Sequence, residues 1–306
     1  MNTDHPVIAI ENLHRQFGKT EAVNGLNLEV QRGRCYGFFG RNGAGKTTTI
    51  KCLLNLLKPT HGSVQLFGMD PQQHEVATKS RLAYVPDSVA VYPWMTIAQY
   101  FEYLASFRTT WNRDLQDNLL LRFDLKADQK AESLSKGQKM QMALIAALCP
   151  EPELLILDEP TSGLDPLIRK EFIEVVIGAY QESDPENRTV LVSTHLITEF
   201  EGLIDEFTIL DHGKTIFSAL TENARARFRR IRARFPGTPP KIQSSEIVTQ
   251  VEDGRTVEYM IYGDVDPLAQ QIKSHAAEDQ QIEALSLEEI FLLTAKNHTR
   301  YDFSQN

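Results

Sequence analysis

Short apolar runs alternate with helical segments along the first two thirds of the chain. Leu26, Leu28 and Val30 alternate with polar residues, which predicts a half-buried strand. Unbroken apolar runs predict strands buried on both faces, at 35–39, 154–157, 189–192 and 207–210. Helical spacing separates several of these runs, at 96–105, 115–123 and 139–148. The alternation predicts an α/β core with a parallel sheet.

The pattern changes near residue 220. Six of the ten residues 225–234 are arginine, and a segment rich in Pro and Gly follows. The run could bind acidic lipid or nucleic acid. The other interpretation is a solvated helix face that leads into an edge strand, with Ile231, Ala233 and Phe235 facing inward. Because the positive charge is local in an acidic chain, the second interpretation is favoured. Further strands and helices are then predicted at 247–251, 257–262, 282–285, 267–274 and 287–294.

Residues 40–48 read GRNGAGKTT and fill every fixed position of the pattern G-x-x-x-x-G-K-[ST]. The loop follows one predicted strand and opens a predicted helix at 47–57, so backbone amides and a helix N-terminus face an anion. Lys46 is expected at the β and γ phosphates of a nucleotide, and the Thr47 hydroxyl is expected to bind Mg²⁺. The predicted nucleotide-binding residues are Gly40, Arg41, Asn42, Gly43, Ala44, Gly45, Lys46, Thr47 and Thr48.

Composition narrows the class of protein. A chain of 306 residues with 42% hydrophobic content can fill a sizeable core, and a net charge of −9 argues against a nucleic-acid partner. Cys35, Cys52 and Cys149 lie in apolar runs without metal-ligand spacing, which predicts buried thiols in a reducing compartment. We find neither a signal-peptide pattern nor an apolar run of membrane-spanning length, so a cytoplasmic location is expected.

Two further motifs point to a reaction. The apolar run at 154–157 ends in Asp158 and Glu159, which places two acids beside the phosphate loop. Asp158 is expected to hold Mg²⁺, and Glu159 to polarise a water for attack on the γ-phosphate. The alternative is a buried strand with two acids at its mouth. The sequence LSKGQ at 134–138 opens a predicted helix shortly before that strand.

Together these motifs resemble those of ATP-binding cassette (ABC) ATPases. The phosphate loop, LSKGQ, LLILDEP, SGLD and STH occur in the order and at the spacing of that family, and the resemblance covers roughly residues 7–217. It implies a P-loop ABC ATPase core over 1–219, with a mixed sheet, an antiparallel β subdomain and a helical subdomain at about 88–150. A small C-terminal α+β domain is expected over 220–306.

The resemblance also implies roles for single residues. Phe17 is expected to stack on adenine with Val23 lining the same face, although Phe17 could instead be a core aromatic. Glu159 is the expected catalytic base, and His195 is expected to contact the γ-phosphate. Residues expected to contact ATP bound by the opposite subunit are Ser135, Gly137, Gln138 and Asp165.

Two positions depart from the family pattern. Lys136 replaces the first glycine of the usual signature L-S-G-G-Q. Asp87 stands where the family normally has a glutamine that reaches Mg²⁺ and the attacking water. Aspartate is shorter and charged, so a water-bridged Mg²⁺ contact is expected, while a purely structural role for Asp87 stays open.

The function implied is an ATP-hydrolysing transporter subunit that uses ATP and Mg²⁺. Two such subunits, identical or closely related, would close over two ATP molecules and move a separate integral-membrane permease, with the ATPase peripheral on the inner face of the membrane. The segment 285–292 resembles the C-terminal extension of ATPases that serve exporters. Tyr92 and Trp94 offer apolar surfaces beside the expected permease groove, although both could instead pack inside the helical subdomain.

Two alternatives remain. A soluble ABC ATPase that acts on ribosomes or DNA is disfavoured by the single phosphate loop and by the absence of an inserted coiled coil or Cys pairs in the sequence. A regulatory cassette with little turnover is suggested by Lys136 and Asp87. It is disfavoured because the sequence retains Lys46, Asp158, Glu159 and His195.

Overall fold

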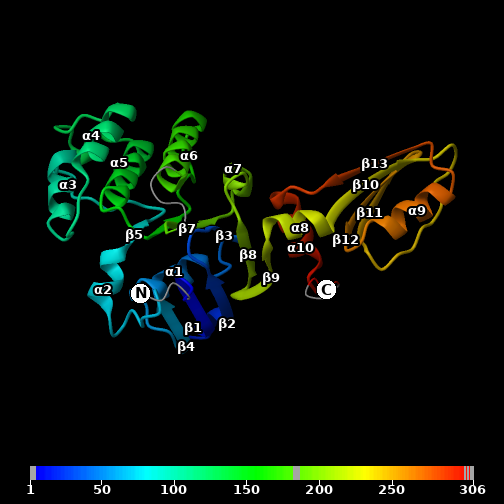
Figure 1. The fold of residues 1–306 in the computed structure, drawn as a ribbon, viewed down its shortest axis with the longest axis horizontal. Helices are drawn as coiled ribbons and strands as arrows, with labels where there is room; N and C mark the ends of the chain where they lie inside the picture. The colour runs from blue at the N-terminus through cyan, green and yellow to red at the C-terminus, as the bar shows by residue number, and fades with distance from the viewer. Residues whose placement is uncertain (1–4, 182–186, 300, 302, 304–306) are drawn as a thin grey trace.

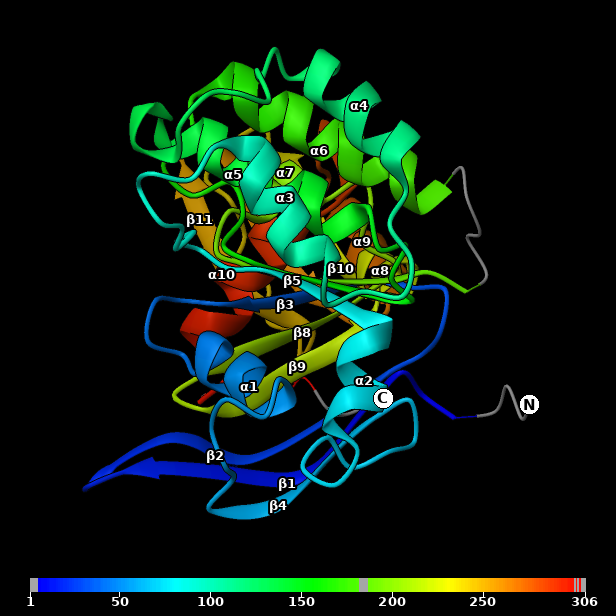
Figure 2. The same cartoon turned by 90° about the vertical axis from the view of Figure 1, so that its left-hand side faces the viewer.

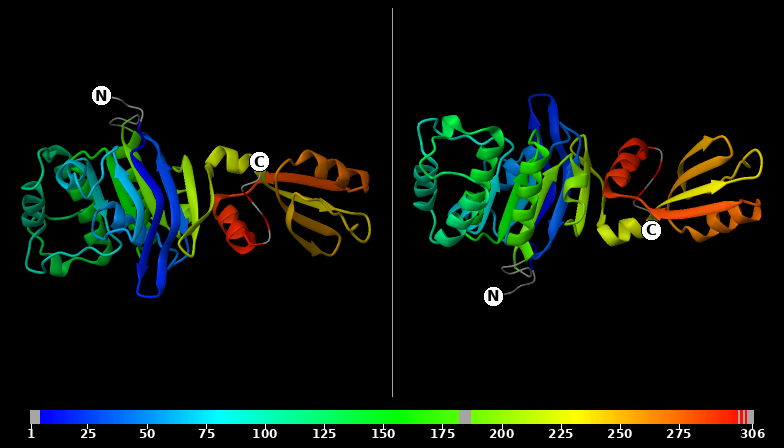
Figure 3. Two further views of the ribbon diagram at one scale, coloured as in Figure 1. Left: turned by 90° about the horizontal axis from the view of Figure 1, so that it is seen from below. Right: turned by 90° about the horizontal axis from the view of Figure 1, so that it is seen from above.

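A computed structural model describes residues 5–181, 187–299, 301 and 303, which form an elongated molecule built on three sheets (Figure 1). A three-stranded sheet has the order β2-β1-β4, a six-stranded sheet β5-β6-β7-β3-β8-β9, and a four-stranded sheet β11-β12-β10-β13. The first two sheets lie with α1 to α7 at one end of the molecule. The third sheet lies with α9 at the other end, as the two views of Figure 3 show.

The described elements have the following bounds. The strands are β1 (Ile8–Phe17), β2 (Thr20–Val30), β3 (Cys35–Gly40), β4 (His61–Leu66), β5 (Leu82–Val85), β6 (Leu154–Asp158), β7 (Thr189–Thr194), β8 (Glu206–Asp211), β9 (Lys214–Leu220), β10 (Phe228–Arg234), β11 (Ile247–Asp253), β12 (Thr256–Tyr262) and β13 (Asp279–Ala284). The helices are α1 (Lys46–Leu53), α2 (Glu75–Arg81), α3 (Ile97–Ala105), α4 (Arg113–Arg122), α5 (Lys136–Leu148), α6 (Pro166–Gln181), α7 (Ile197–Phe200), α8 (Thr221–Arg227), α9 (Asp266–Ser274) and α10 (Leu287–Asn297), with a 3-10 turn at Ala131–Ser133.

The six-stranded sheet is mixed, as expected. Strands β5, β6, β7, β3 and β8 run parallel, and β9 returns antiparallel after a tight turn. Side chains alternate between the two faces: Leu155 and Leu157 join one apolar core, whereas Leu154 and Ile156 join the other. Because both faces are covered, the inner strands read as unbroken apolar runs, which is why the sequence located them.

Each face of this sheet has its own cover (Figure 2). Helices α5 and α6 pack on one face, through residues such as Leu144 and Phe172. The sheet β2-β1-β4 and helix α1 cover the other face, where Ile8, Leu26 and Ile50 are buried. The phosphate loop joins β3 to α1, and its residue Ala44 is buried in this second core.

The predicted strands and helices are confirmed, with ends displaced by a few residues. The helix expected at 47–57 is shorter, because Leu54 already leaves the helical conformation. The three cysteines are buried, as expected. Among the described residues, no helix has the length and apolar character needed to span a membrane.

The arginine run occupies the end of α8 and all of β10. Ile231, Ala233 and Phe235 are buried, as predicted, and they pack with the residues of α9. The prediction of an edge strand is wrong, because β10 lies between β12 and β13. Both of these strands come later in the chain, and their pairing is not encoded in the local pattern of β10. Arg230 forms ion pairs with Glu258 and Glu289, so this part of the run is bound to acids of its own chain.

The C-terminal sheet contributes to a small core of its own and, through Phe228 and Tyr262, to the larger core. Residues of β10, β12 and α9 form a small core of their own. Helix α10 instead returns to the larger core, where Leu287 and Ile290 are buried. The backbone N–H of Leu287 donates to Glu201 at 2.9 Å, and Arg225 pairs with the same carboxylate at 2.8 Å. The boundary near residue 220 stays a prediction, since α10 packs with elements that precede that boundary.

Glu153 connects three segments around the start of β6. Arg81, at the end of α2, donates to both of its carboxylate oxygens at 2.5 and 2.7 Å. Arg32, from the turn after β2, donates at 2.8 Å. The hydrogen bonds from Arg81, more than those from Arg32, hold the pKa of Glu153 below its ordinary value against the opposing effect of burial.

We expect Glu153→Gln to lower the free energy of unfolding at pH 7 by about 1 kcal/mol or less, because the carboxylate is about one-third exposed and partly screened. A carboxyl whose pKa is depressed by folding stabilises the protein above its unfolded pKa, and this contribution disappears as pH falls through the folded value. The difference between wild type and variant should therefore shrink below about pH 4.5. Urea unfolding of wild type and variant at pH 7 and at pH 4 measures this difference in the free energy of unfolding.

Glu75→Gln is the matched control, since Glu75 is an exposed acid that pairs with Lys79 one helical turn away. A destabilisation equal in the two variants, or one that is independent of pH, would contradict the role assigned to Glu153.

Candidate nucleotide-binding site

The phosphate loop requires glycine for steric reasons at two of its positions. Gly45 has a φ of 105°, and a Cβ there would lie 2.4 Å from the carbonyl oxygen of Ala22. A Cβ on Gly40 would lie 2.8 Å from the carbonyl oxygen of Leu210. The loop is therefore pressed against β2 and the end of β8, and it leads directly into the N-terminus of α1.

Lys46 is the first residue of α1, and its side chain is almost completely buried. Its ammonium group donates to the carbonyl oxygen of Gly40 at 2.7 Å, within the loop itself. It also lies 3.0 Å from Oε1 of Glu159. The cation thus lies between the loop that cradles phosphate and the acid predicted to be the catalytic base.

Asp158 ends β6 and is 1% exposed. Burial raises the pKa of this carboxyl, while hydrogen bonds from the Thr47 and Ser193 hydroxyls act in the opposite direction. The bond from Ser193 Oγ to Oδ1 is 3.0 Å long, and the Tyr84 hydroxyl lies 3.5 Å from Oδ2. A carboxylate this deep needs such partners, and Thr47 joins it directly to the phosphate loop.

Glu159 follows Asp158 and turns the chain out of the sheet with a φ of 49°. Its Oε2 lies 2.7 Å from Nδ1 of His195 and also accepts from the backbone N–H of His195 at 3.3 Å. His195 comes directly after β7, the strand next to β6. The two predicted catalytic residues are therefore in contact, and Lys46 binds the other oxygen of the same carboxylate.

A cavity of about 500 Å³ opens over these groups. It brings together most of the residues that the sequence singled out, from segments far apart in the chain. Its lining consists of Phe17, Ala22, Arg41, Asn42, Gly43, Ala44, Gly45, Lys46, Thr47, Thr48, Asp87, Glu159, Ser162 and His195. Ala22 and Ser162 were not predicted, and the alternation of residues along β2 was the only signal for Ala22.

The expectation that Val23 lines the nucleotide site is wrong. Val23 is completely buried in the core between the two sheets. Its neighbour Ala22 faces the cavity instead, because successive side chains of a strand point to opposite sides. Phe17 is 44% exposed at the cavity rim, so it is not a core aromatic. The Arg15 guanidinium lies 4.4 Å from the centre of its ring.

The signature residues are outside this cavity. Ser135 caps α5 by accepting from the Gln138 N–H at 3.2 Å, and the Gln138 side chain accepts from the Ser135 N–H at 3.0 Å. A Cβ on Gly137 would lie 2.7 Å from Cδ1 of Ile168, so glycine lets α5 approach α6. Asp165 caps α6 through the N–H groups of the first turn. Their contact with a second subunit stays a prediction.

The oxygen donors in the site fit Mg²⁺. The Thr47 hydroxyl acts on the pKa of Asp158, and Thr47 and Asp87 line the same cavity. Within the described ranges, no three His, Cys, Asp or Glu side chains cluster as a metal cage. Magnesium prefers oxygen ligands and is commonly held by one or two carboxylates together with substrate phosphates. This donor set therefore suits a cation that binds with a nucleotide.

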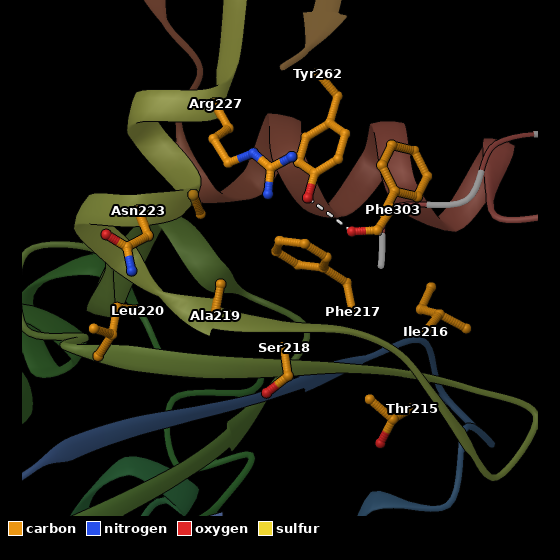
Figure 4. Close-up of a pocket in the computed structure, with 11 residues that line it drawn as sticks. Thr215, Ile216, Phe217, Ser218, Ala219, Leu220, Asn223, Arg227, Tyr262 and Phe303 are labelled. Carbon is orange, nitrogen blue, oxygen red and sulfur yellow. Dashed lines mark hydrogen bonds between the residues drawn. The ribbon is translucent and has the colours of Figure 1, made fainter. Parts of the chain in front are cut away.

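A second cavity, of about 510 Å³, lies between β9, α8 and β12 (Figure 4). The rings of Phe217, Tyr262 and Phe303 lie within 6.5 Å of one another along its wall, and the Arg227 guanidinium lies 4.3 Å from the centre of the Tyr262 ring. None of the residues predicted to bind nucleotide lines it. The aromatic cluster joins the last strand of the six-stranded sheet to the C-terminal sheet.

The loop, the buried acid and the flanking cation define a P-loop nucleotide-binding protein, and known proteins refine this class. The profile of the ABC transporter family matches residues 23–162. The bacitracin transport ATP-binding protein BcrA of Bacillus licheniformis is 33% identical over 73% of this chain and 73% of its own length. The Nod factor export ATP-binding protein I of Ralstonia nicotianae is 32% identical over 69% of this chain and 66% of its own length.

Solved structures agree. The ATP-binding subunit of an ABC transporter superposes with a TM-score of 0.65 at 26% identity, over 72% of this chain and 92% of that one. A dimeric ATP-binding cassette bound to ADP and phosphate has the same fold, with a TM-score of 0.61 at 22% identity, over 70% of this chain and 98% of that one. The chain belongs to the ABC transporter family and is an ATP-binding ATPase subunit of that family.

Proposed function

We propose that this chain hydrolyses ATP to drive a separate membrane permease in the export direction. The observation that carries the proposal is the contact of the Glu159 carboxylate with Lys46 on one side and His195 on the other, inside the phosphate-loop cavity. Export is supported by the relatives, two of which are named for bacitracin transport and Nod factor export. A subunit of this kind would lie on the inner face of the membrane, held there by the permease.

The cavity suggests how each residue contributes to hydrolysis. The loop amides and Lys46 bind the phosphates, and Phe17 stacks on the base at the rim. Mg²⁺, held by Thr47 and Asp158 with Asp87 nearby, would neutralise charge on the β and γ phosphates. Glu159 orients a water and takes up its proton, and His195, bonded to Glu159, contacts the γ-phosphate.

A second subunit would complete the site. Ser135 is exposed at the N-cap of α5, next to Gly137 and Gln138, and Asp165 is exposed at the start of α6, so the N-termini of two helices lie side by side at the surface. In the proposed dimer these groups approach the γ-phosphate of the ATP bound by the partner. The second subunit is either another copy of this chain or a closely related ATPase.

The permease would bind at the segment before α3. Tyr92 and Trp94 are 57% and 65% exposed, and their rings stack with centroids 4.8 Å apart. They therefore do not pack inside the helical region. Two adjacent exposed aromatic rings are typical of residues that anchor a protein interface.

The regulatory alternative, a cassette with little turnover, is less well supported. Such a cassette should have lost the contacts among Lys46, Glu159 and His195, whereas all of them are present.

Replacing Glu159 tests the proposed reaction. We expect Glu159→Gln to retain ATP binding, because the phosphate loop is unchanged, and to lower kcat by about 100-fold or more through loss of general-base assistance. It should also accumulate as an ATP-bound dimer in gel filtration. Glu199→Gln is the control, since Glu199 is paired with Arg169 outside the cavity. Near-normal hydrolysis by Glu159→Gln would remove Glu159 from the catalytic role.

Replacing Asp87 tests the proposed Mg²⁺ contact. Asp87→Ala should raise the Mg²⁺ concentration that gives half-maximal ATPase activity, because an oxygen near the cation is lost. Asp87→Gln, which introduces the usual residue of the family, should restore the wild-type value. Superimposable Mg²⁺ titrations for wild type and Asp87→Ala would instead favour a structural role.

Replacing the exposed aromatic pair tests the proposed permease surface. Trp94→Ala, alone or with Tyr92→Ala, should weaken copurification with the permease from detergent-solubilised membranes and leave ATP binding intact. Leu121→Ala is the matched control, because Leu121 on α4 is 82% exposed but lies outside this segment. Undiminished assembly of the double variant would contradict the assignment of this surface.

A further inference from the structure

Lys136 forms an unexpected contact at the start of α5. A cation in the first turn of a helix faces the positive end of the helix dipole, so the position is unfavourable for lysine by itself. No carboxylate among the described residues forms an ion pair with Lys136. Its ammonium group instead donates to the backbone carbonyl oxygen of Ser162 at 2.6 Å. Hydrogen bonds from a charged donor are stronger than those between neutral groups.

The acceptor lies in the loop that joins the catalytic acid to α6. The Ser162 N–H donates to the carbonyl oxygen of Glu159 at 3.1 Å, so the loop turns tightly around the end of β6. Gly163 has a φ of 70°, and a Cβ there would lie 3.2 Å from the Lys136 ammonium nitrogen. Glycine at this position therefore gives the turn its conformation and leaves room for the lysine side chain.

Ser162 also forms part of the nucleotide cavity. It lines the cavity together with Glu159 and His195, while its carbonyl oxygen is bonded to Lys136. The same short loop ends at Asp165, which caps α6. The Lys136 ammonium group thus connects the start of α5 with a loop that lines the nucleotide cavity of the same subunit. The same loop leads to Asp165.

We propose that Lys136 is a positioning residue for hydrolysis, which holds the loop 162–165 against the start of α5. The proposal deepens the proposed function and rests on it, because it assumes that the signature and Asp165 act on ATP in a closed dimer. In this arrangement, a movement of α5 on dimer closure moves the loop beside Glu159 as well. Lys136 stands where the family signature has glycine, and its side chain adds a hydrogen bond between the start of α5 and the loop 162–165.

Hydrogen exchange tests the link itself, on the full chain without nucleotide. Lys136→Met keeps the aliphatic stem and removes the donor, whereas Lys136→Arg keeps a charged donor. We expect amides of 162–165 to exchange roughly three- to tenfold faster in Lys136→Met, within the range for loss of one typical hydrogen bond, because this bond is exposed to water. Lys136→Arg should restore slow exchange. Lys139→Met, on the same helix, is the matched control and should leave these amides unchanged.

Steady-state ATP hydrolysis tests the consequence. Lys136→Met should lower kcat by about three- to tenfold with a KM for ATP within about twofold of wild type, and Lys136→Arg should recover most of the loss. Equal exchange and equal kcat in Lys136→Met and Lys139→Met would overturn the proposal, as would higher turnover in Lys136→Gly. If wild type hydrolyses no ATP, the proposed function fails, and the exchange experiment still decides whether Lys136 holds the loop.

Discussion

The structure depends on keeping the buried carboxylate of Asp158 satisfied at the end of a strand that is apolar on both faces. Water cannot solvate this group, so the Thr47 and Ser193 hydroxyls must stabilise its negative charge. Those hydroxyls come from the phosphate loop and from β7. The strand order β6-β7-β3 brings all three segments to one edge of the sheet, since parallel strands end on the same side. The need to satisfy this one buried carboxylate therefore accounts for the meeting of β6, β7 and the phosphate loop at the site.

Much of this arrangement could be predicted from sequence because its signals are local. An apolar strand, a glycine-rich loop and a helix identify the phosphate site, and an apolar strand ending in two acids identifies its partner. The errors arise where a position depends on distant segments. Val23 and Ala22 differ only in the face of β2 that each occupies, and that face is set by packing on another sheet. Strand β10 looked like an edge strand, although β12 and β13 later cover both of its sides.

The two departures from the family pattern leave Lys46 and His195 in contact with Glu159 in the cavity. Asp87 still faces the same space as Lys46 and Thr47. Lys136 leaves the capping interactions of Ser135 and Gln138 undisturbed, since its own side chain extends to Ser162. Both changes place a charged side chain where the family has a neutral residue, glycine at position 136 and glutamine at position 87. We infer that the departures alter how the site is held and how it binds a cation, while the reaction type is that of the family.

The packing of α10 has a consequence for how this chain folds during synthesis. The apolar residues of α10 fill part of the core under β8 and β9, yet they follow the whole C-terminal sheet in the sequence. That core stays incomplete while β10 to β13 are being synthesised, even though every strand of the six-stranded sheet has already left the ribosome. Phe217 on β9 would be open to solvent in this interval, because Tyr262 and Phe303, which pack against it, come later in the chain. Such exposed apolar surfaces are where nascent chains aggregate or meet chaperones. The larger core is therefore completed only after the C-terminal sheet has been synthesised.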